Sequence, residues 1–485
     1  MPKYLRHTKI VATVGPASES EDMLRKLMEA GADVFRLNFS HGDHEGKARM
    51  IRRIRELSLE RKRAVAILAD LQGPKIRTGR MENGAVMLEA GSTLEITTEE
   101  VLGTARLFST VYKPLPEDVV PGDRILLDDG LLELKVLATE PARVRCRVVV
   151  GGLLKDRKGI NLPGVKVSVP ALTDKDMEDL EFCLGQEVDY IALSFVRRAE
   201  DVHQLKERLF EAKSGMQVIA KIEKPEAVDH FAEILEAADG IMVARGDLGV
   251  EMLPEKVPLI QKRIIRMCNE AGKPVITATQ MLESMIGNPR PTRAETSDVA
   301  NAILDGTDAV MLSAETASGS YPLEAVSLMV RVALDVEGDP VLKEQIFHPI
   351  PQVRGYQQLP EAIAQAACRV GENLGCSAIL AFTQTGKTAT LVAKYRPKVP
   401  IFAVTPSQQV RRSMALYRGV YSIRVEICGD TESQIRSVEQ AVLEGGMLRT
   451  GQTVVVTMGS PVSDPGTTNL MKVHRLGAGR FFEVY

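Results

Sequence analysis

The chain has 485 residues, and its 61 basic and 64 acidic side chains give a formal net charge of −3 at neutral pH. This near balance predicts no affinity for nucleic acid or for an anionic membrane surface. No run approaches the roughly 20 apolar residues that span a bilayer, and residues 1–10 lack a signal-peptide core. The six cysteines follow no metal-ligand spacing, so we expect reduced thiols in a cytoplasmic protein.

Short apolar runs of strand length recur along the first part of the chain, and each is followed by unusual polar residues. Amphipathic stretches lie between them, and the starts at Ser18 to Glu21 and at Thr292 to Glu295 match the capping box of a helix. Strand-then-helix units with polar residues at the strand ends predict a (β/α)8 barrel with its active site on that face. The eight predicted strands are residues 10–14, 34–37, 65–69, 190–193, 218–222, 241–244, 275–278 and 309–312.

Two further regions interrupt or follow this alternation, so we expect the barrel to comprise residues 1–72 and 169–345. Residues 73–168 lose helical periodicity and contain a hairpin signal at Asp129-Gly130, followed by an apolar run from Val144 to Val150. This predicts an all-β domain, inserted after the third strand, that acts as a lid. Residues 346–485 alternate again, with strands expected at 378–383, 399–404, 420–425 and 453–458, and we assign this α/β domain to regulation or assembly.

Lys221 and Glu223 form the most informative pair, because they lie two apart at the end of an apolar run. On a strand both side chains point to the same face. A buried lone charge is costly, and opposed charges at a strand end suggest a lysine beside a metal site. A purely structural ion pair is the alternative.

Seven segments, in order and mostly at strand ends, resemble pyruvate kinase. The resemblance covers nearly the whole chain and implies transfer of the phosphoryl group of phosphoenolpyruvate to ADP, giving pyruvate and ATP. It also implies a homotetramer. A lyase acting on phosphoenolpyruvate or pyruvate, or a non-catalytic sensor of sugar phosphates, are the alternatives. The segments are Arg36 to Gly42, Gly73 to Gly79, Gly159 to Gly164, Ala220 to Glu223, Met242 to Gly249, Thr279 to Met285 and Leu312 to Thr316.

With this resemblance, Glu223 and Asp247 on neighbouring strands can share one Mg²⁺ (or Mn²⁺), which prefers hard oxygen ligands. Lys221 is then an electrostatic stabiliser of the transferring group. The backbone around Gly246 and Asp247 offers N–H groups to the substrate carboxylate. Arg36 clamps phosphoryl oxygens, and the remaining assignments are Thr279 and Ser313 for proton transfer and Arg77, Lys158, His41 and Asn38 for the nucleotide.

A monovalent cation site would be built from Asn38, Ser40, Asp70 and the carbonyl of Leu71. Family members that look potassium-dependent read Asp-Thr-Lys-Gly-Pro-Glu where this chain has Asp70 to Lys75. The fixed ammonium of Lys75 can take over the role of the ion, so we expect activity without K⁺. The alternative is that Lys75 only extends to solvent.

Residues Thr383 to Thr388 read Thr-Gln-Thr-Gly-Lys-Thr, which resembles a P-loop but has Ala381 at its first glycine position. A hydroxyl-rich turn at a helix start still suits a phosphate group. In the family resemblance this position matches the loop that binds an allosteric, phosphorylated effector, with Ser460 to Asn469 facing it. The effector residues are therefore expected to be Thr383, Thr385, Gly386, Lys387 and Thr388.

Overall fold

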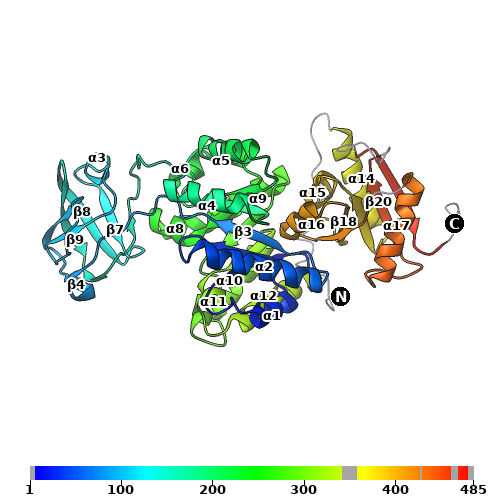
Figure 1. Cartoon of the computed structure of the whole chain (residues 1–485), viewed down its shortest axis with the longest axis horizontal. Helices are drawn as coiled ribbons and strands as arrows, with labels where there is room; N and C mark the ends of the chain where they lie inside the picture. The colour runs from blue at the N-terminus through cyan, green and yellow to red at the C-terminus, as the bar shows by residue number, and fades with distance from the viewer. Residues whose placement is uncertain (1–5, 341–357, 427–428, 460–467, 479–485) are drawn as a thin grey trace.

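The computed structural model describes residues 6–340, 358–426, 429–459 and 468–478, and arranges them as three domains in a row (Figure 1). A closed barrel of eight parallel strands lies in the middle. A strand-rich β domain lies at one end of the barrel and an α/β domain at the other (Figure 1). The predicted fold class is confirmed.

The barrel strands are almost completely buried, which explains why their sequences are continuous apolar runs. All eight predicted strands form, each within one residue of its expected bounds. Their order around the barrel follows the chain, and the β domain enters between β3 and β12. The strands are β1 (Lys9–Val14), β2 (Val34–Asn38), β3 (Ala66–Asp70), β12 (Tyr190–Leu193), β13 (Gln217–Ile222), β14 (Gly240–Ala244), β15 (Val275–Ala278) and β16 (Ala309–Leu312).

Helices surround the barrel, and Ser20, Thr173 and Thr292 each cap the start of one of them with a hydroxyl group. The predicted capping box at Thr292 and Glu295 is present. The other prediction was wrong in detail: Ser20 caps the first helix and no reciprocal box forms, since the Ser18 hydroxyl instead bonds with the turn at Gly15. The helices are α1 (Glu21–Ala30), α2 (His44–Glu60), α4 (Asp174–Leu184), α5 (Ala199–Glu211), α6 (Pro225–Asp229), α7 (Phe231–Ala237), α8 (Arg245–Glu251), α9 (Val257–Ala271), α10 (Arg293–Leu304), α11 (Ala314–Ala317) and α12 (Pro322–Gly338), with short turns η2 (Pro254–Lys256) and η3 (Glu283–Ile286).

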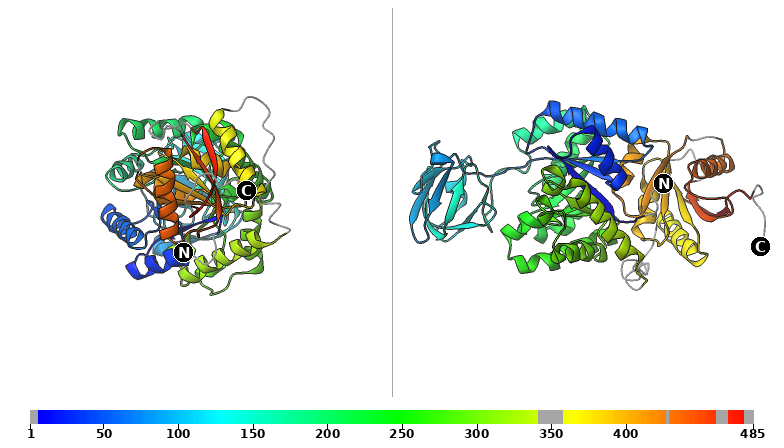
Figure 2. Two further views of the ribbon diagram at one scale, coloured as in Figure 1. Left: turned by 90° about the vertical axis from the view of Figure 1, so that its right-hand side faces the viewer. Right: turned by 90° about the horizontal axis from the view of Figure 1, so that it is seen from below.

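The β domain has its own apolar core and stands off from the barrel (Figure 2). Two connecting segments without regular secondary structure, residues 71–76 and 162–172, join it to the barrel. The predicted hairpin is present: Asp128, Asp129 and Gly130 adopt positive φ angles of 52°, 55° and 86° between two paired strands. The elements are η1 (Glu82–Gly84), β4 (Ala85–Leu88), β5 (Thr93–Thr97), β6 (Leu107–Ser109), α3 (Leu115–Asp118), β7 (Arg124–Leu127), β8 (Leu132–Glu140), β9 (Arg143–Val150), β10 (Gly152–Lys155) and β11 (Ile160–Asn161).

The α/β domain contains the four predicted parallel strands and one that sequence reasoning missed. That strand, β21, pairs antiparallel with β20 at the edge of the sheet. The elements are α14 (Leu359–Asn373), β17 (Ala378–Phe382), α15 (Lys387–Lys394), β18 (Ile401–Thr405), α16 (Gln408–Ser413), η4 (Met414–Leu416), β19 (Val420–Arg424), α17 (Thr431–Glu444), β20 (Thr453–Met458) and β21 (Leu470–Arg475).

The α/β domain closes the amino end of the barrel. Ala415 and Leu416 of η4 join the apolar cluster formed by the inward side chains of the barrel strands. The hydroxyl of Tyr190, at the start of β12, donates to the carbonyl of Ser413. Because the C-terminal ends of the strands point the other way, they remain open toward the β domain.

An aspartate stands immediately before every second barrel strand at this amino end. Each carboxylate accepts the N–H of a neighbouring strand and pairs with a cation. For two of the four the cation comes from the α/β domain, so charge pairing adds to the apolar contact between the domains. The aspartates, with donor N–H and cation, are Asp33 (Ile10; Arg6 and Arg63), Asp189 (Ile67; Arg55 and Arg412), Asp239 (Val218; Lys206) and Asp308 (Val275; Arg396).

Cys146, Cys183, Cys268, Cys368 and Cys376 are free and buried, while Cys428 lies outside the described residues. Across the described ranges, every helix is too short or too polar to cross a membrane.

Candidate active site

Lys221 lies at the centre of a buried polar cluster at the C-terminal end of the barrel. Its Nζ is 2.8 Å from Oε1 of Glu223 and 3.2 Å from Oδ1 of Asp70, and it donates to the Ser194 hydroxyl at 2.7 Å. Burial alone would lower the pKa of Lys221, but the carboxylates of Asp70 and Glu223 outweigh it and raise that pKa. The lysine therefore stays protonated, and the predicted pair is present.

Glu223 faces both a cation and a second carboxylate. Its Oε2 accepts the backbone N–H of Phe195 at 2.7 Å. Burial, reinforced by the charge of Asp247, raises the pKa of Glu223 despite the nearby Lys221. Asp247 is half-buried in the first turn of α8, directly after the neighbouring strand β14. Glu223 and Asp247 thus place two negative charges close together at the C-terminal end of the barrel.

These two carboxylates fit a hard divalent cation that takes its other ligands from water and substrate. No group of three or more His, Cys, Asp or Glu side chains placed to hold a metal ion occurs in the part of the chain that the structure describes. A site assembled from protein ligands alone is therefore not found among those residues. The excess of carboxylate charge beside Glu223 agrees with a bound cation.

Arg36 on β2 contacts both neighbouring strands at the mouth of the barrel, which is the opening at the C-terminal ends of the strands. Its Nε is 2.6 Å from Oδ2 of Asp70 on β3, and its NH1 donates to the Thr13 hydroxyl on β1 at 3.0 Å. Burial would raise the pKa of Asp70, but Lys221 and Arg36 outweigh it and hold the pKa below its usual value. Arg36 and Lys221 therefore share one ionised carboxylate.

Thr279 occupies a strained position at the end of β15, where it and Gln280 have positive φ angles of 67° and 52°. Its hydroxyl accepts the N–H of Gly246 at 2.7 Å and donates to the carbonyl of Ala278 at 2.6 Å. Arg245 donates to the Thr279 carbonyl at 2.7 Å and pairs with Asp298. The side chain of Arg245 thus holds this strained segment in place, and the Gly246 N–H predicted to bind a substrate here donates to the Thr279 hydroxyl.

Ser313 begins the loop after β16, and its N–H donates to Glu315 at 2.7 Å. The structure shows no bond between Ser313 and Thr279. It therefore places both predicted proton-relay residues at the mouth without joining them.

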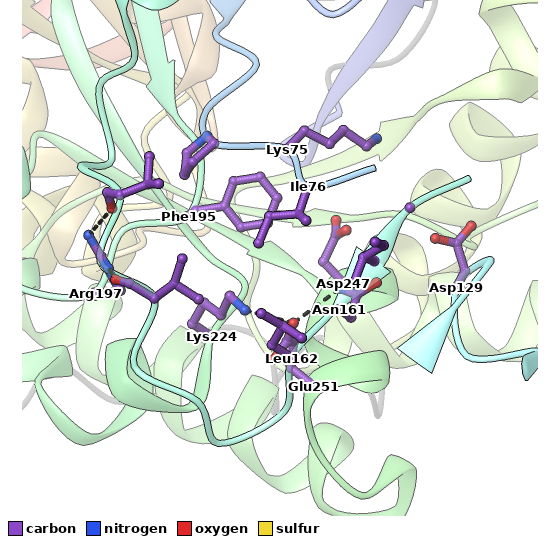
Figure 3. Close-up of a pocket in the computed structure, with 15 residues that line it drawn as sticks. Lys75, Ile76, Asp129, Asn161, Leu162, Phe195, Arg197, Lys224, Asp247 and Glu251 are labelled. Atoms are coloured by element: carbon purple, nitrogen blue, oxygen red, sulfur yellow. Dashed lines mark hydrogen bonds and ion pairs between the residues drawn. The ribbon is translucent and has the colours of Figure 1, made fainter. Parts of the chain in front are cut away.

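The cleft between the barrel and the β domain contains several predicted residues (Figure 3). Lys75 and Asp247 line it, together with Phe195 from the barrel. Opposite them lie residues of the β domain, including Ile160, Asn161 and Leu162. The cleft therefore extends from Asp247, one of the two candidate metal ligands, to the β domain.

The predicted nucleotide residues come from both the barrel and the β domain. Lys158 pairs with Asp128 at 2.8 Å, within the β domain, and Arg77 donates to the carbonyl of Arg157 at 3.0 Å. His41 lies on the barrel, and burial together with the charges of Lys75, Arg77, Lys47 and Arg36 lowers its pKa. The structure thus brings His41 near Arg77, and it does not bring Lys158 into contact with Lys221.

Three of the four candidate monovalent-cation ligands, Asn38, Asp70 and Leu71, already accept hydrogen bonds from protein groups. The Asn38 side-chain carbonyl accepts the N–H of Ser40 at 3.0 Å. The Leu71 carbonyl accepts the hydroxyl of Ser194 at 2.8 Å. Asp70, as described above, is held by Lys221 and Arg36.

The predicted effector residues lie in the α/β domain, beyond the opposite end of the barrel from the cleft (Figure 1). They span the turn from β17 into α15, where Gly386 adopts a φ of 93°. Thr388 is buried, and its hydroxyl is 2.8 Å from that of Thr468. Of the predicted facing loop, residues 460–467 lie outside the described residues.

Sequence reasoning assigned no role to Ser194, Phe195 or Arg245. Their contacts with Lys221, Glu223 and Thr279 place them in the site. All three directly follow barrel strands, so the rule that located the other candidates could have found them.

Comparisons with known proteins agree along the chain. A family model described as pyruvate kinase, barrel domain, matches residues 5–326, and one described as pyruvate kinase, alpha/beta domain, matches residues 361–474. A pyruvate kinase of Geobacillus stearothermophilus is 52% identical over 473 residues, which are 97% of this chain and 80% of that protein. One of Staphylococcus aureus (strain NCTC 8325 / PS 47) is 48% identical over 475 residues, 98% and 81% of the two chains. The crystal structure of a pyruvate kinase from Cryptosporidium parvum superimposes with a TM-score of 0.89 at 40% identity, covering 97% of this chain and 96% of that one.

Proposed function

Since the chain belongs to the pyruvate kinase family, we propose that phosphoryl transfer takes place at the cluster around Lys221, in the cleft between the barrel and the β domain. The protein is a phosphotransferase with phosphoenolpyruvate and ADP as substrates and pyruvate and ATP as products. Pyruvate kinases generally use Mg²⁺. Identity at this level over nearly the whole chain disfavours the lyase and the sensor.

The permanent charge of Lys221 is the observation that carries the proposed mechanism. A lysine whose pKa is raised by two carboxylates cannot serve as a base near neutral pH. Its role is to offset the negative charge that develops on the transferring phosphoryl group and on the enolate oxygen. Arg36 holds phosphoryl oxygens from β2, on the far side of Asp70 from Lys221, and backbone N–H groups at Gly246 and Asp247 hold the carboxylate.

Glu223 and Asp247 are the proposed ligands of the Mg²⁺ (or Mn²⁺). When bound there, the ion would neutralise substrate oxygens as a Lewis acid. Mixing the purified protein with phosphoenolpyruvate, ADP and Mg²⁺ and following pyruvate tests the activity. Glu223→Gln should raise the Mg²⁺ concentration needed for half-maximal rate at least about tenfold, whereas Glu270→Gln on the exposed face of α9 should leave it unchanged.

The β domain is proposed to act as a lid that carries nucleotide contacts. Arg77 and Lys158 would bind ADP phosphates, with His41 and Asn38 on the barrel side. Thr279 would pass a proton to the enolate carbon, with Ser313 and water completing the path. The proposed domain limits remain 1–72 with 169–345, 73–168 and 346–485.

We also propose that activity does not depend on K⁺. The support is that Asn38, Asp70 and Leu71 already accept hydrogen bonds or ion pairs from the protein. Lys75 contributes a fixed positive charge in the cleft, near His41. Ser40 would be the remaining member of such a site.

A phosphorylated effector is proposed to bind through Thr383, Thr385, Gly386, Lys387 and Thr388 in a cytoplasmic homotetramer. A sugar phosphate or nucleoside monophosphate should then lower the phosphoenolpyruvate concentration needed for half-maximal rate several-fold, which corresponds to about 1–3 kcal/mol of coupling. The double variant Lys387→Ala/Thr388→Ala should lose this shift and keep its basal rate. A response that survives in the double variant would place the effector elsewhere.

A further inference from the structure

The β domain touches the barrel at the carboxyl end of α8. Nδ2 of Asn161, on β11, donates to Oε1 of Glu251 at 3.0 Å, so a hydrogen bond crosses between the two domains (Figure 3). The hairpin tip lies beside the same helix end: a methyl group built on Gly130 would be 3.7 Å from Cγ1 of Val250. The contacts of Asn161 and Gly130 with α8 lie outside the two connecting segments.

Glu251 is a buried charge whose cation comes from the barrel itself. Nζ of Lys224 is 2.7 Å from the same Oε1, and the two side chains are 11% and 1% exposed. Oε2 of Glu251 is buried and has no hydrogen-bond partner. The ion pair holds Glu251 without help from the β domain, so Asn161 can leave and return while Glu251 keeps its counter-charge.

The two connecting segments are fixed to the barrel independently of this contact. Buried Asp176 accepts the N–H of Gly73 in the first connecting segment at 3.0 Å, and it accepts the N–H of Thr173, just after the second segment, at 3.0 Å. Arg197 donates to the carbonyls of Val167 and Val169 in the second connecting segment. Ser168, between them, instead bonds to Asp118 of the β domain. The two connecting segments therefore fix where the β domain is attached. Its angle relative to the barrel depends on contacts outside these segments.

We propose that Glu251 is a positioning residue that, through Asn161, sets the angle of the β domain over the cleft. Helix α8 carries Gly246 and Asp247 at its start and Glu251 at its end, so the helix that presents the proposed substrate and metal groups also anchors the domain that presents the nucleotide groups. The part concerning nucleotide affinity rests on the proposed role of Arg77 and Lys158. Asn161 is the partner that leaves Glu251 when the β domain moves away from the barrel.

Asn161→Ala removes this bond and leaves the Lys224–Glu251 pair intact. A hydrogen bond to a charged acceptor contributes enough that its loss should raise KM for ADP about tenfold, because less of the protein holds the β domain in the binding position. KM for phosphoenolpyruvate, which is assigned to barrel groups, should change less than about twofold. Asn288→Ala, the same truncation on the exposed surface of the barrel, is the matched control and should change neither value.

Ligand-free protein gives a second readout that does not depend on catalysis. Spin labels on cysteines introduced at Met87 in the β domain and Phe210 on α5, which are 57% and 84% exposed, report the distance between the two domains. The distance distribution should broaden in Asn161→Ala and stay narrow in Asn288→Ala. An unchanged distribution would overturn the proposal.

A double-mutant cycle identifies Glu251 as the partner. The variant Lys224→Met/Glu251→Leu replaces the buried ion pair with apolar side chains, a change that proteins often tolerate. In this background Asn161→Ala should have no further effect on the distance distribution. An equally large further effect would show that Asn161 acts through another group.

The positioning role of Glu251 and the proposed nucleotide-binding role of Arg77 can be tested separately. If Arg77→Ala leaves KM for ADP unchanged, the proposed role of Arg77 is wrong. The spin-label distances in Asn161→Ala would still decide whether Glu251 positions the β domain.

Discussion

The two ends of the barrel both bury ion pairs, but they differ in how completely each carboxylate is satisfied. At the amino end, Asp189 pairs with Arg55 at 2.6 Å and Arg412 at 2.9 Å, and it accepts the N–H of Ile67 at 2.8 Å. The α/β domain covers this end, so the Asp189 ion pairs are cut off from solvent. Such an arrangement holds two domains together.

At the carboxyl end, one lysine is shared by Asp70, Glu223 and Ser194, and a further carboxylate, Asp247, lies nearby. Three carboxylates thus face two cations, Lys221 and Arg36, so negative charge is in excess, and Asp247 borders an open cleft. A buried ion pair therefore does not by itself indicate function. An unbalanced cluster beside a cleft does, because it can bind a further charged group.

The largest effect on stability should come from the amino end. Asp189→Asn leaves the buried Arg55 and Arg412 with only the exposed Glu187 as counter-charge, and removing one partner of a buried ion pair typically costs about 3–5 kcal/mol. We expect the urea midpoint, followed by circular dichroism, to fall markedly, while kcat of the folded variant stays within about twofold. Arg266→Ala breaks an exposed pair with Glu270 and should cost less than about 1 kcal/mol. Equal losses in the two variants would remove the distinction between buried and exposed pairs.

The largest effect on kcat should come from a substitution in the Lys221 cluster at the mouth of the barrel. Lys221→Met should lower kcat by about 10²–10³-fold, the usual cost of removing one charge-stabilising donor, with little change in far-UV circular dichroism. Lys206→Met breaks the pair with Asp239 at the amino end and should retain kcat. Near-normal turnover in Lys221→Met would show that the mouth cluster is structural, like the pairs at the other end.

Reversing the charge of Lys75 should create a dependence on potassium. Two unit charges about 10 Å apart interact by roughly 1.7 kcal/mol at an effective dielectric of 20, and reversing one of them changes the interaction by roughly 3.3 kcal/mol. Lys75→Glu should therefore lose about 10²-fold in rate in a buffer with only organic cations. Added K⁺ should restore much of that rate. The parent should show near-full activity without K⁺, and a parent that is inactive until K⁺ is added would contradict the proposal.

The amino end should also govern acid stability, through Asp33. Burial favours a higher pKa for this carboxyl, but Arg6, Lys9 and Arg63 outweigh it and lower the pKa below 3.8. The folded state therefore holds its proton less tightly than the unfolded state. The resulting stability is present above about pH 4 and is lost as the pH falls through the folded pKa. Asn has no proton to bind, so the thermal midpoint of Asp33→Asn should fall less steeply than that of the parent below about pH 4. Parallel curves would show that Asp33 does not control this loss.

The sequence alone determined the local structure of the barrel. Apolar runs bounded by polar residues located β1 to β3 and β12 to β16 within one residue, because a strand buried on both faces needs a continuous apolar sequence. The positive φ angles of the Asp129-Gly130 turn likewise follow from local residue preferences. The proximity of Lys221 and Glu223 followed from their spacing on one strand.

Other features depended on contacts between residues far apart in the chain. Strand β21 gains its place by pairing with β20 at the edge of the sheet, and Ser194 meets Lys221 because β12 pairs in parallel with β13. The contact from Asn161 to Glu251 spans 90 residues and joins two domains. Local periodicity shows which face of an element is buried. Which residues meet across that face depends on strand order, barrel closure and domain docking, and only the tertiary structure decided these.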